Sequence, residues 1–290
     1  MAMIENTSYK DRPAIAITNG ILTATFLPVD GAKLVSLKDA NGNEYLSQAK
    51  GKTYKRLGLQ TSYIEAECSA FDDMFPTVDP CTMNEMEYLD HGEVARREHD
   101  VQCLEDAVIF TCSLEALHVV YEKQASFMGE ELAIVYKIKN LNSFDFPYVF
   151  AGHIMFRGEC GAAVVCDLEE TAAKEIMFGN PKGKPNLLCE KGTDKEWKYY
   201  YNEALSPLNC SVRYPLSRYT VSVNCDSEII KYLGVWMNPG DLNGMYNIAL
   251  EPCSALYDSP IKAKETCSYI KAYGTVEFVL KIGIKREENK

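Results

Sequence analysis

The sequence predicts an all-β fold, a large antiparallel β-sandwich with few short helices. Apolar and polar residues alternate in many short segments, turn dipeptides separate these segments, and a helical period of 3.6 residues is almost absent. Many strands at roughly hairpin spacing are typical of a large sandwich or barrel. Because the 290 residues contain no linker and no internal repeat, we expect a single domain spanning residues 1–290.

The N-terminal third contains three alternating segments that we expect to be strands. Asn19-Gly20, a dipeptide that suits a tight hairpin turn, separates the first two, and the polar run 39–43 follows the third. The expected strands span residues 14–17, 21–27 and 33–38.

Residues 68–90 interrupt this pattern. The ten residues from Phe71 to Pro80 include two prolines and three acidic residues, which makes the stretch a poor candidate for regular structure. We therefore predict a long surface loop here, lying over one face of the sandwich. Functional residues often lie in such loops.

Strand-like alternation resumes after Arg97 and is clearest near the C-terminus. An aromatic run at 144–156 contains His153, and residues 169–178 are the best candidate for a short helix. The further expected strands span residues 108–114, 132–139 and 276–284.

Composition limits the partners and the compartment. The 30 basic and 41 acidic residues give a formal net charge of −11, which argues against a nucleic-acid or anionic-membrane surface. No apolar run approaches the length of a membrane span, and residues 1–11 lack the apolar stretch of a signal peptide. The eleven cysteines include no Cys-x-x-Cys pair, so we expect reduced thiols and no structural metal. These features predict a cytoplasmic, soluble protein.

Glu251 is the first candidate for chemistry. Ile248 and Leu250 alternate as in a half-buried strand, and Pro252 follows Glu251 at once, so the strand ends there or lies at an edge. A carboxylate beside a buried surface has a raised pKa, which suits a general base. A solvated glutamate at a strand end is the alternative interpretation.

The four histidines differ in their surroundings. His118 lies in an apolar segment and is predicted to be a strand residue, and His99 lies in a charged run and is predicted to be solvated. His153 is embedded among apolar residues, so it is either a core residue or a proton donor with a tuned pKa. His91 precedes Gly92, where the glycine serves either a simple turn or a close approach of the backbone to a ligand.

The sequence lacks a nucleophile elbow, a phosphate-binding loop, a dinucleotide-binding fingerprint and a paired-histidine metal motif. Carboxylates, histidines and aromatic residues remain, including 18 tyrosines. These residue types suit a carbohydrate site, because aromatic faces pack against the apolar faces of sugar rings.

Four blocks, in order along nearly the whole chain, resemble the aldose 1-epimerase (galactose mutarotase-like) superfamily in its divergent bacterial branch. Each block is short, and the ordered set carries the resemblance. The blocks are Leu22–Ala32, Phe71–Pro76 with Asp90–Glu93, Gly152-His153 with Phe156, and Leu233–Trp236 followed by Leu250–Pro252.

This resemblance implies a β-supersandwich with a sugar site in a cleft on one sheet, and an isomerase activity. By matching position, it implies that Glu251 is the catalytic base and His153 the acid, with substrate contacts from His91, Asp73 and Trp236. Glu251 would take the proton of the anomeric hydroxyl while His153 protonates the ring oxygen, and reclosure after rotation about C1–C2 gives the other anomer. Each group moves one proton, so no cofactor and no metal is expected.

Two positions depart from the family pattern. Ile154 follows the acid histidine where the family commonly has proline, and Ser69-Ala70 stands where two glycines often precede the Phe-Asp block. Both positions belong to the backbone of the site, so the sugar preference stays open. The expected partner is a small-molecule sugar, and the expected state is a monomer or homodimer.

Three alternatives share these residues. A hexose-6-phosphate mutarotase would need a basic phosphate pocket, and a non-catalytic sugar-binding protein would keep the cleft without the chemistry. A retaining glycosidase using Asp73 with Glu251 would need the two carboxyl groups to face each other at roughly 5–5.5 Å. The candidate phosphate ligands are Arg56, Arg96, Arg97 and Arg157.

Overall fold

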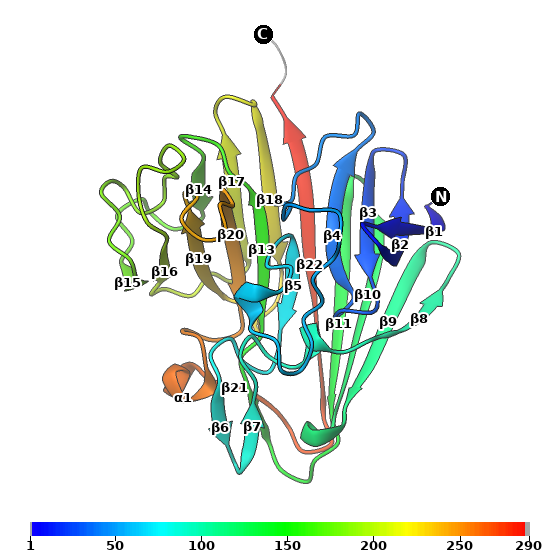
Figure 1. Ribbon diagram of the computed structural model, residues 1–290. Coiled ribbons are helices and arrows are strands. Elements are labelled where there is room, and N and C mark those ends of the chain that lie inside the picture. The colour runs from blue at the N-terminus through cyan, green and yellow to red at the C-terminus, as the bar shows by residue number, and fades with distance from the viewer. Residues whose placement is uncertain (1, 288–290) are drawn as a thin grey trace.

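The computed structural model describes residues 2–287 and consists mainly of two large antiparallel sheets (Figure 1). The sheet that carries the candidate site, called the site sheet below, has ten strands within these residues. In spatial order they are β1 (Met3–Tyr9), β2 (Arg12–Thr18), β3 (Leu22–Leu27), β4 (Lys33–Asp39), β5 (Phe71–Met74), β13 (Ala151–Arg157), β20 (Asn247–Cys253), β19 (Tyr232–Asn238), β16 (Trp197–Tyr201) and β15 (Lys174–Phe178).

The second sheet, called the back sheet, has eight strands within the described residues and packs against the site sheet. In spatial order they are β14 (Ala163–Cys166), β17 (Leu208–Tyr214), β18 (Tyr219–Cys225), β22 (Thr275–Arg286), β11 (Glu131–Asn140), β10 (Val119–Met128), β9 (Ala107–Leu114) and β8 (Asp100–Cys103). The expected all-β antiparallel sandwich is therefore confirmed.

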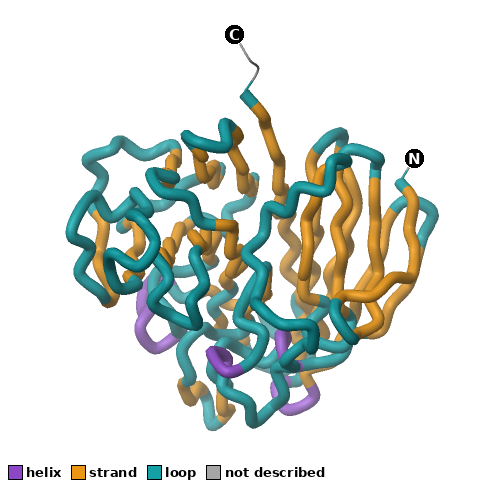
Figure 2. Tube along the Cα trace, turned by 45° about the horizontal axis from the view of Figure 1, so that its top comes forward, coloured by secondary structure: helices purple, strands orange, loops and turns teal. Residues whose placement is uncertain are grey.

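The remaining regular elements are small. They lie toward one end of the molecule, where Figure 1 shows α1 beside β6, β7 and β21 and Figure 2 shows the helical turns. They are the pairs β6 (Cys81–Met83) with β7 (Met86–Tyr88) and β12 (Phe146–Tyr148) with β21 (Ser268–Ile270), the helix α1 (Pro260–Ala263), and the 3₁₀ turns Tyr63–Glu65, Val94–Arg96, Glu115–Leu117 and Lys264–Thr266.

The hydrophobic core fills the space between the two sheets. Phe26 on β3 lies 5.2 Å from Phe110 on β9, and Tyr136 on β11 lies 5.1 Å from Phe150, measured between ring centroids. All four side chains are fully buried. Each such burial contributes about 1.5–3 kcal/mol to folding.

The strand predicted at residues 108–114 shows the expected alternation in β9 of the back sheet. Val108, Phe110, Cys112 and Leu114 are buried and alternate with more exposed residues, because one face of this sheet meets the core and the other meets solvent. The central strands of the site sheet differ, since every residue of β5 and β20 is buried. Both faces of these strands are covered, by the back sheet on one side and by loops on the other.

This double coverage explains why the prediction of a surface loop over residues 68–90 is partly wrong. Phe71–Met74 form the central strand β5, which pairs with β13 and β4, and residues 81–88 form the β6–β7 hairpin. A short strand that is buried on both faces has no apolar–polar alternation for the sequence to display.

Two further local predictions are wrong. The expected helix at 169–178 contains the edge strand β15, whose neighbour is β16. The α-helix of the described residues lies elsewhere, at α1, where Ser259 accepts a hydrogen bond from the backbone N–H of Lys262 and Pro260 begins the helix.

Two histidines also lie in surroundings other than those expected. His99 is buried against Tyr121, and this burial lowers the pKa of His99 to about 3. His118 is exposed and adopts a left-handed backbone (φ 51°) between a 3₁₀ turn and β10, so it is a turn residue and not a strand residue.

All eleven cysteines are free thiols in the structure, as the sequence predicts. Of these, Cys68, Cys112, Cys210, Cys225 and Cys253 are buried. Among residues 2–287, no helix is long and apolar enough to cross a membrane.

A buried ion pair joins the two sheets. Asp73 on β5 accepts a hydrogen bond from Lys123 Nζ on β10 at 2.6 Å and from the Tyr136 hydroxyl on β11 at 2.8 Å. Asp73 and Lys123 are each 1 % exposed. Both carboxylate oxygens of Asp73 are therefore occupied inside the core.

We expect Lys123→Met to lower the free energy of unfolding by about 3–5 kcal/mol, because Asp73 would keep a buried negative charge without its cation. Urea denaturation measures this change. Lys271→Met, which removes an exposed ion pair with Asp145, is the matched control and is expected to leave the midpoint nearly unchanged. Similar midpoints for the two variants would contradict the assignment.

Candidate active site

The register of the central strands brings the candidate residues to one face of the site sheet. His153 on β13 lies opposite Asp72 on β5, and Glu251 on β20 lies opposite Gly234 on β19. Trp236 lies two residues from Gly234, so it shares this face. Side chains at every second position of neighbouring strands therefore converge, although they are far apart in sequence.

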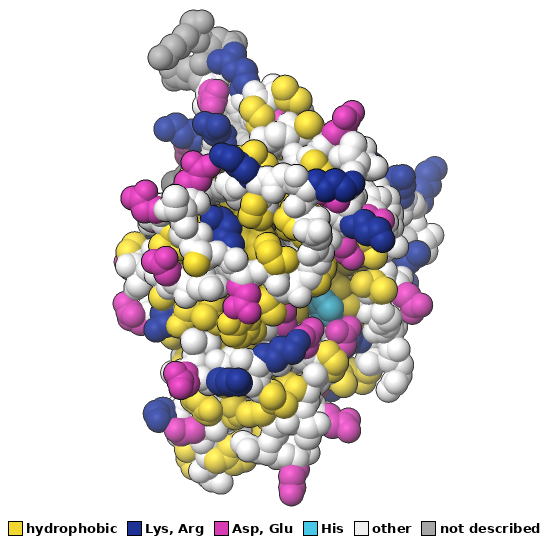
Figure 3. All heavy atoms as spheres, turned by 90° about the vertical axis from the view of Figure 1, so that its left-hand side faces the viewer, with side chains coloured by type: hydrophobic (Ala, Val, Ile, Leu, Met, Phe, Trp, Pro, Cys, Tyr) yellow, Lys and Arg dark blue, Asp and Glu magenta, His cyan; other side chains and the backbone are white. Residues whose placement is uncertain are grey.

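This face is the floor of a cavity of about 340 Å³. Loops supply the walls, and one histidine is visible among apolar and acidic side chains on the molecular face of Figure 3. The residues that line the cavity are Tyr63, Ile64, Cys68, Val78, Asp79, His91, His153, Met177, Phe178, Glu196, Lys198, Trp236, Leu242, Glu251, Asp258 and Lys262.

Glycine is required at two positions around this cavity. A Cβ on Gly234 would lie 3.0 Å from the ring of Tyr200 and 3.3 Å from Glu251 Cβ, so the glycine leaves room for both side chains. Gly92 has a φ of +74°, and its Cβ would lie 2.4 Å from the carbonyl oxygen of Phe75. Gly92 thus allows the chain to turn next to His91 and to pack closely against the backbone of Phe75.

Glu251 is buried against a lysine. Its side chain is 1 % exposed, and Lys198 Nζ lies 2.8 Å from Oε2. The same ammonium group lies 2.6 Å from Asp258 Oδ1, which also accepts a hydrogen bond from Tyr200 at 2.9 Å. Apart from the ion pair, no hydrogen-bond donor among the described residues reaches either Glu251 oxygen. The carboxylate is therefore available to accept a proton from a ligand.

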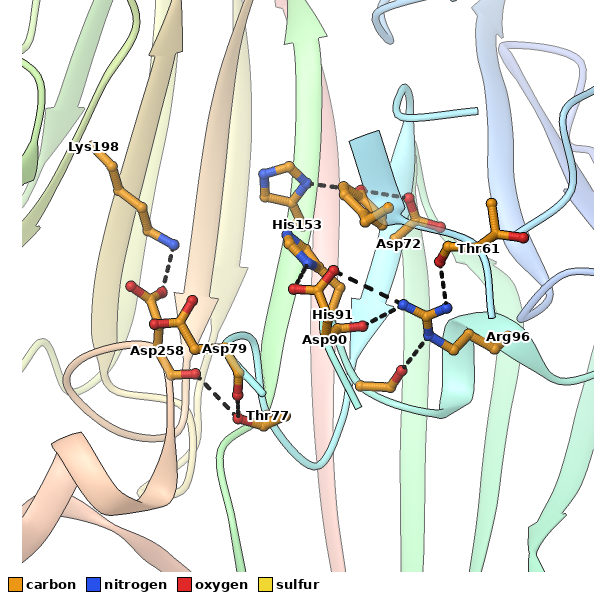
Figure 4. Close-up of polar contacts among 12 residues, drawn as sticks. Thr61, Asp72, Thr77, Asp79, Asp90, His91, Arg96, His153, Lys198 and Asp258 are labelled. Carbon is orange, nitrogen blue, oxygen red and sulfur yellow. Dashed lines mark hydrogen bonds and ion pairs between the residues drawn. The ribbon is translucent and has the colours of Figure 1, made fainter. Parts of the chain in front are cut away.

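His153 faces Glu251 across a short gap. His153 Nε2 lies 3.5 Å from Glu251 Oε1, and the imidazole is 6 % exposed. Its other nitrogen, Nδ1, lies 3.3 Å from the hydroxyl oxygen of Tyr63, which in turn lies 2.8 Å from Asp72 (Figure 4). The imidazole is thus placed between a carboxylate and a phenol.

Burial shifts the pKa values of these groups in opposite directions. Burial raises the pKa of Glu251, and the positive charge of Lys198 partly opposes this shift. Burial, together with the charge of Lys198, holds the pKa of His153 well below its usual range. Burial alone would lower the pKa of Lys198, but Glu251 and Asp258 raise it, so the ammonium form persists.

The other predicted contacts form the cavity walls. His91 stacks on Tyr63 with ring centroids 4.0 Å apart and an interplanar angle of 5°, and its Nδ1 lies 2.8 Å from Asp90. Trp236 lies 5.6 Å from His153 between ring centroids and donates its N–H to Glu196 at 2.9 Å. The indole therefore presents a fixed flat surface to the cavity.

Four of the five residues expected at the site meet in this cavity: Glu251, His153, His91 and Trp236. The structure does not bring Asp73 there. Strand alternation directs Asp73 into the core, whereas its neighbour Asp72 lies on the cavity side and contacts Tyr63. The sequence resemblance pointed to the Asp72-Asp73 dipeptide but selected Asp73, whose side chain faces the core, and not Asp72, whose side chain faces the cavity side.

The four candidate phosphate ligands lie elsewhere, and none of the arginines within residues 2–287 lines the cavity. Arg96 is buried and donates to the backbone carbonyls of the surrounding loop, and Arg97 is paired with Glu93. Arg157 lines a different cavity, and Arg56 lies beside Asp30.

Sequence reasoning missed Lys198, Asp258 and Tyr63. Lys198 did carry a signal, because it is a lone lysine among Trp197 and three consecutive tyrosines in a strand that is buried throughout. A lysine in such a strand needs a buried carboxylate partner. Neither Asp258 nor Tyr63 has a comparable local signal, because both lie outside strands, where no buried strand pattern marks them.

The fold is a sandwich of two large antiparallel sheets with a cavity on one of them, and comparison with known proteins identifies its class. No protein-family profile matches the sequence, and no curated protein matches it. Solved structures match over nearly the whole chain. The chain has the galactose mutarotase-like fold, as the sequence resemblance implied, at identities expected of a divergent branch.

Three of these structures illustrate the likeness. A provisionally assigned aldose 1-epimerase of Klebsiella pneumoniae is 13 % identical with a TM-score of 0.79, and the match covers 99 % of this chain and 88 % of that one. A protein of Synechocystis is 15 % identical (TM-score 0.73; 98 % and 100 % covered). A galactose mutarotase-like protein of Lactobacillus casei is 16 % identical (TM-score 0.68; 93 % and 99 % covered).

We expect the imidazole of His153 to remain neutral at pH 6 in the ligand-free protein, because its burial and the nearby Lys198 disfavour the charged form. Side-chain ¹⁵N chemical shifts followed over a pH titration measure this. A histidine in a model peptide, which titrates near 6.5, is the reference. Half-protonation of His153 at that pH would contradict the described environment.

Proposed function

We propose that this protein is a mutarotase, an aldose 1-epimerase that interconverts the α and β anomers of a neutral aldose without a cofactor. The observation that carries the proposal is the pair of buried acid–base groups, Glu251 and His153, at 3.5 Å in a cavity walled by an indole. The anomeric hydroxyl oxygen and the ring oxygen are bonded to the same carbon. A base and an acid that act on these two oxygens must therefore be close neighbours.

The protonation of the pair fits a cycle with two half-reactions. The pair carries one proton, which passes from Glu251 to His153 Nε2 when the sugar binds. Ring opening then moves the proton of the anomeric hydroxyl to Glu251 and the Nε2 proton of His153 to the ring oxygen. The open-chain stage then has a protonated Glu251 and a neutral His153, the forms that burial favours for each group. Rotation about C1–C2 and reclosure with the roles reversed return both protons and give the other anomer.

In this proposal, Lys198 allows Glu251 to return its proton to the sugar when the ring closes again. A fully buried carboxyl without a cation would hold its proton too tightly to give it back. The ion pair with Lys198 lowers the pKa of Glu251 against the effect of burial, and Asp258 holds the lysine in place. Lys198 thereby limits the rise in the pKa of Glu251 that burial causes.

The charges of the cavity favour a neutral sugar over a phosphorylated one. Four acidic residues line it, Asp79, Glu196, Glu251 and Asp258, against the two lysines Lys198 and Lys262, so the formal balance is 2 − 4 = −2. Both lysines are already paired with these carboxylates. A phosphate group would therefore meet repulsion without a free cation among the lining residues.

A retaining glycosidase is not supported by this geometry. Its two carboxyl groups must face each other across the scissile bond. Asp73 lies on the opposite face of the sheet from Glu251 and is held in the core by Lys123. A non-catalytic sugar-binding protein remains the second candidate, and the first experiment below separates it from an enzyme.

We expect Glu251→Gln to reduce catalysed anomer exchange by ~10²–10⁴-fold with sugar binding largely retained, because the amide keeps the shape but cannot take a proton. His153→Asn is expected to cause a similar loss. NMR exchange spectroscopy or polarimetry on freshly dissolved aldoses measures the rate.

His118→Asn is the matched control and should leave the rate unchanged, since His118 is exposed outside the cavity and asparagine tolerates its left-handed backbone. Full activity in Glu251→Gln would refute the mechanism. Sugar binding by the wild-type protein without any acceleration would favour the binding protein.

We expect a bell-shaped pH profile of kcat/KM, because catalysis requires one proton on the Glu251–His153 pair. The lowered pKa of His153 delays uptake of a second proton to acid pH, and the raised pKa of Glu251 delays loss of the shared proton toward alkaline pH. Lys198→Met should move the alkaline limb to higher pH, because the lysine lowers the pKa of Glu251. A limb that stays in place or moves down would contradict this role.

We expect acceleration for one or more free aldoses and little or none for their 6-phosphates, because the cavity lining is acidic. Rates for matched pairs, such as glucose and glucose 6-phosphate, measure the preference at one protein concentration and two ionic strengths. Faster exchange of the phosphorylated sugar would reverse the substrate assignment while leaving the acid–base pair untouched.

A further inference from the structure

Tyr63 occupies a junction of the site that the proposed mechanism does not use. It begins the 3₁₀ turn Tyr63–Glu65, in a loop that covers the outer face of the site sheet, and its side chain is buried. Its hydroxyl oxygen lies 2.8 Å from Asp72 Oδ2 and 3.3 Å from His153 Nδ1. The face of its ring is stacked on His91.

The directions of these hydrogen bonds follow from the number of protons available. Burial raises the pKa of Tyr63 far above its usual range, so the phenol keeps its single proton. Asp72 forms an ion pair with Lys33 at 2.7 Å, and an ionised carboxylate only accepts hydrogen bonds. Tyr63 therefore donates its proton to Asp72 and must accept one from His153.

This direction assigns the tautomer of His153. A neutral imidazole carries one N–H, and the contact with Tyr63 places it on Nδ1. Nε2 then presents its lone pair toward Glu251 Oε1, 3.5 Å away. In the other tautomer, Nε2 would already carry a proton and could not take one up.

We propose that Tyr63 is a positioning residue: its hydroxyl links the Lys33–Asp72 ion pair to His153 and fixes the imidazole in the form with the proton on Nδ1. Nε2 is thereby left free to receive and return the proton that the ring oxygen exchanges. This consequence for catalysis rests on the proposed mutarotase function, whereas the tautomer itself does not depend on it.

The contact network makes the role specific to the hydroxyl group. Lys33 also donates to the backbone carbonyl of Glu67 at 2.7 Å, which ties the covering loop to β4. Asp72 and His153 are directly opposed in the β5–β13 register, so the sheet holds the distance between them. Removing the Tyr63 oxygen alone would therefore leave the frame intact and break the link.

Tyr63→Phe tests the proposal, because it keeps the ring and its stacking on His91 while removing the oxygen. The first readout needs no sugar: long-range ¹H–¹⁵N correlation spectra of the histidine side chains distinguish the two neutral tautomers. We expect His153 to show the Nδ1–H form in the wild-type protein and a mixture with the Nε2–H form in the variant.

The second readout is anomer exchange of a responsive aldose. We expect kcat to fall about tenfold, the rate equivalent of one hydrogen bond to a catalytic group, with KM nearly unchanged. Tyr54→Phe is the matched control, since the Tyr54 hydroxyl also donates to a buried aspartate, Asp30, at 2.8 Å but lies outside the cavity. It should change neither the tautomer nor the rate.

The two readouts separate the two proposals. A Tyr63→Phe protein that keeps the Nδ1–H form would overturn the positioning role, whatever its activity. A tautomer change in a protein whose wild type accelerates no aldose would support the positioning role and overturn the mutarotase function. A tautomer change without any fall in kcat would show that the tautomer does not matter for catalysis and so refute that part of the proposal.

Discussion

Two adjacent aspartates on the short central strand β5 connect the core of this protein to its cleft. Because side chains alternate along a strand, Asp73 points between the sheets, where Lys123 and Tyr136 hold it, and Asp72 points to the opposite face. Asp73 thereby fastens the site sheet to the back sheet. Asp72 fastens the covering loop through Tyr63 and, by the same contact, reaches the imidazole of the candidate acid.

The candidate site contains buried charged groups that stabilise one another by ion pairing. Each ionised group in such a place costs free energy unless a partner of opposite sign lies within contact distance. Lys198 provides that partner for Glu251 and Asp258 together, at 2.8 and 2.6 Å. Burial raises the pKa of Glu251 against the effect of Lys198, and burial lowers the pKa of His153, while the paired ammonium beside them stays charged. This combination suits a reaction that moves protons.

Covering both faces of the central strands is what makes such a site possible. Loops that carry Tyr63, His91 and Asp258 lie over the site sheet and exclude bulk solvent from Glu251. The same coverage removes the alternation that marks a strand in the sequence, so residues 71–74 resemble a loop. The strand that the sequence conceals is therefore one that borders the candidate site.

The sequence by itself determined the two-sheet architecture and most of the candidate residues. Alternation with a period of two is a local property, visible in β9, β11 and β22. The ordered blocks of resemblance located Glu251, His153, His91 and Trp236. Only the tertiary structure decided that Asp73 belongs to the core, that His99 is buried, and that Lys198, Asp258 and Tyr63 complete the site. These facts depend on which face of a strand is covered and on partners that pair across strands and loops. Apart from the aromatic neighbours of Lys198, the residues adjacent in sequence carry no signal of such contacts.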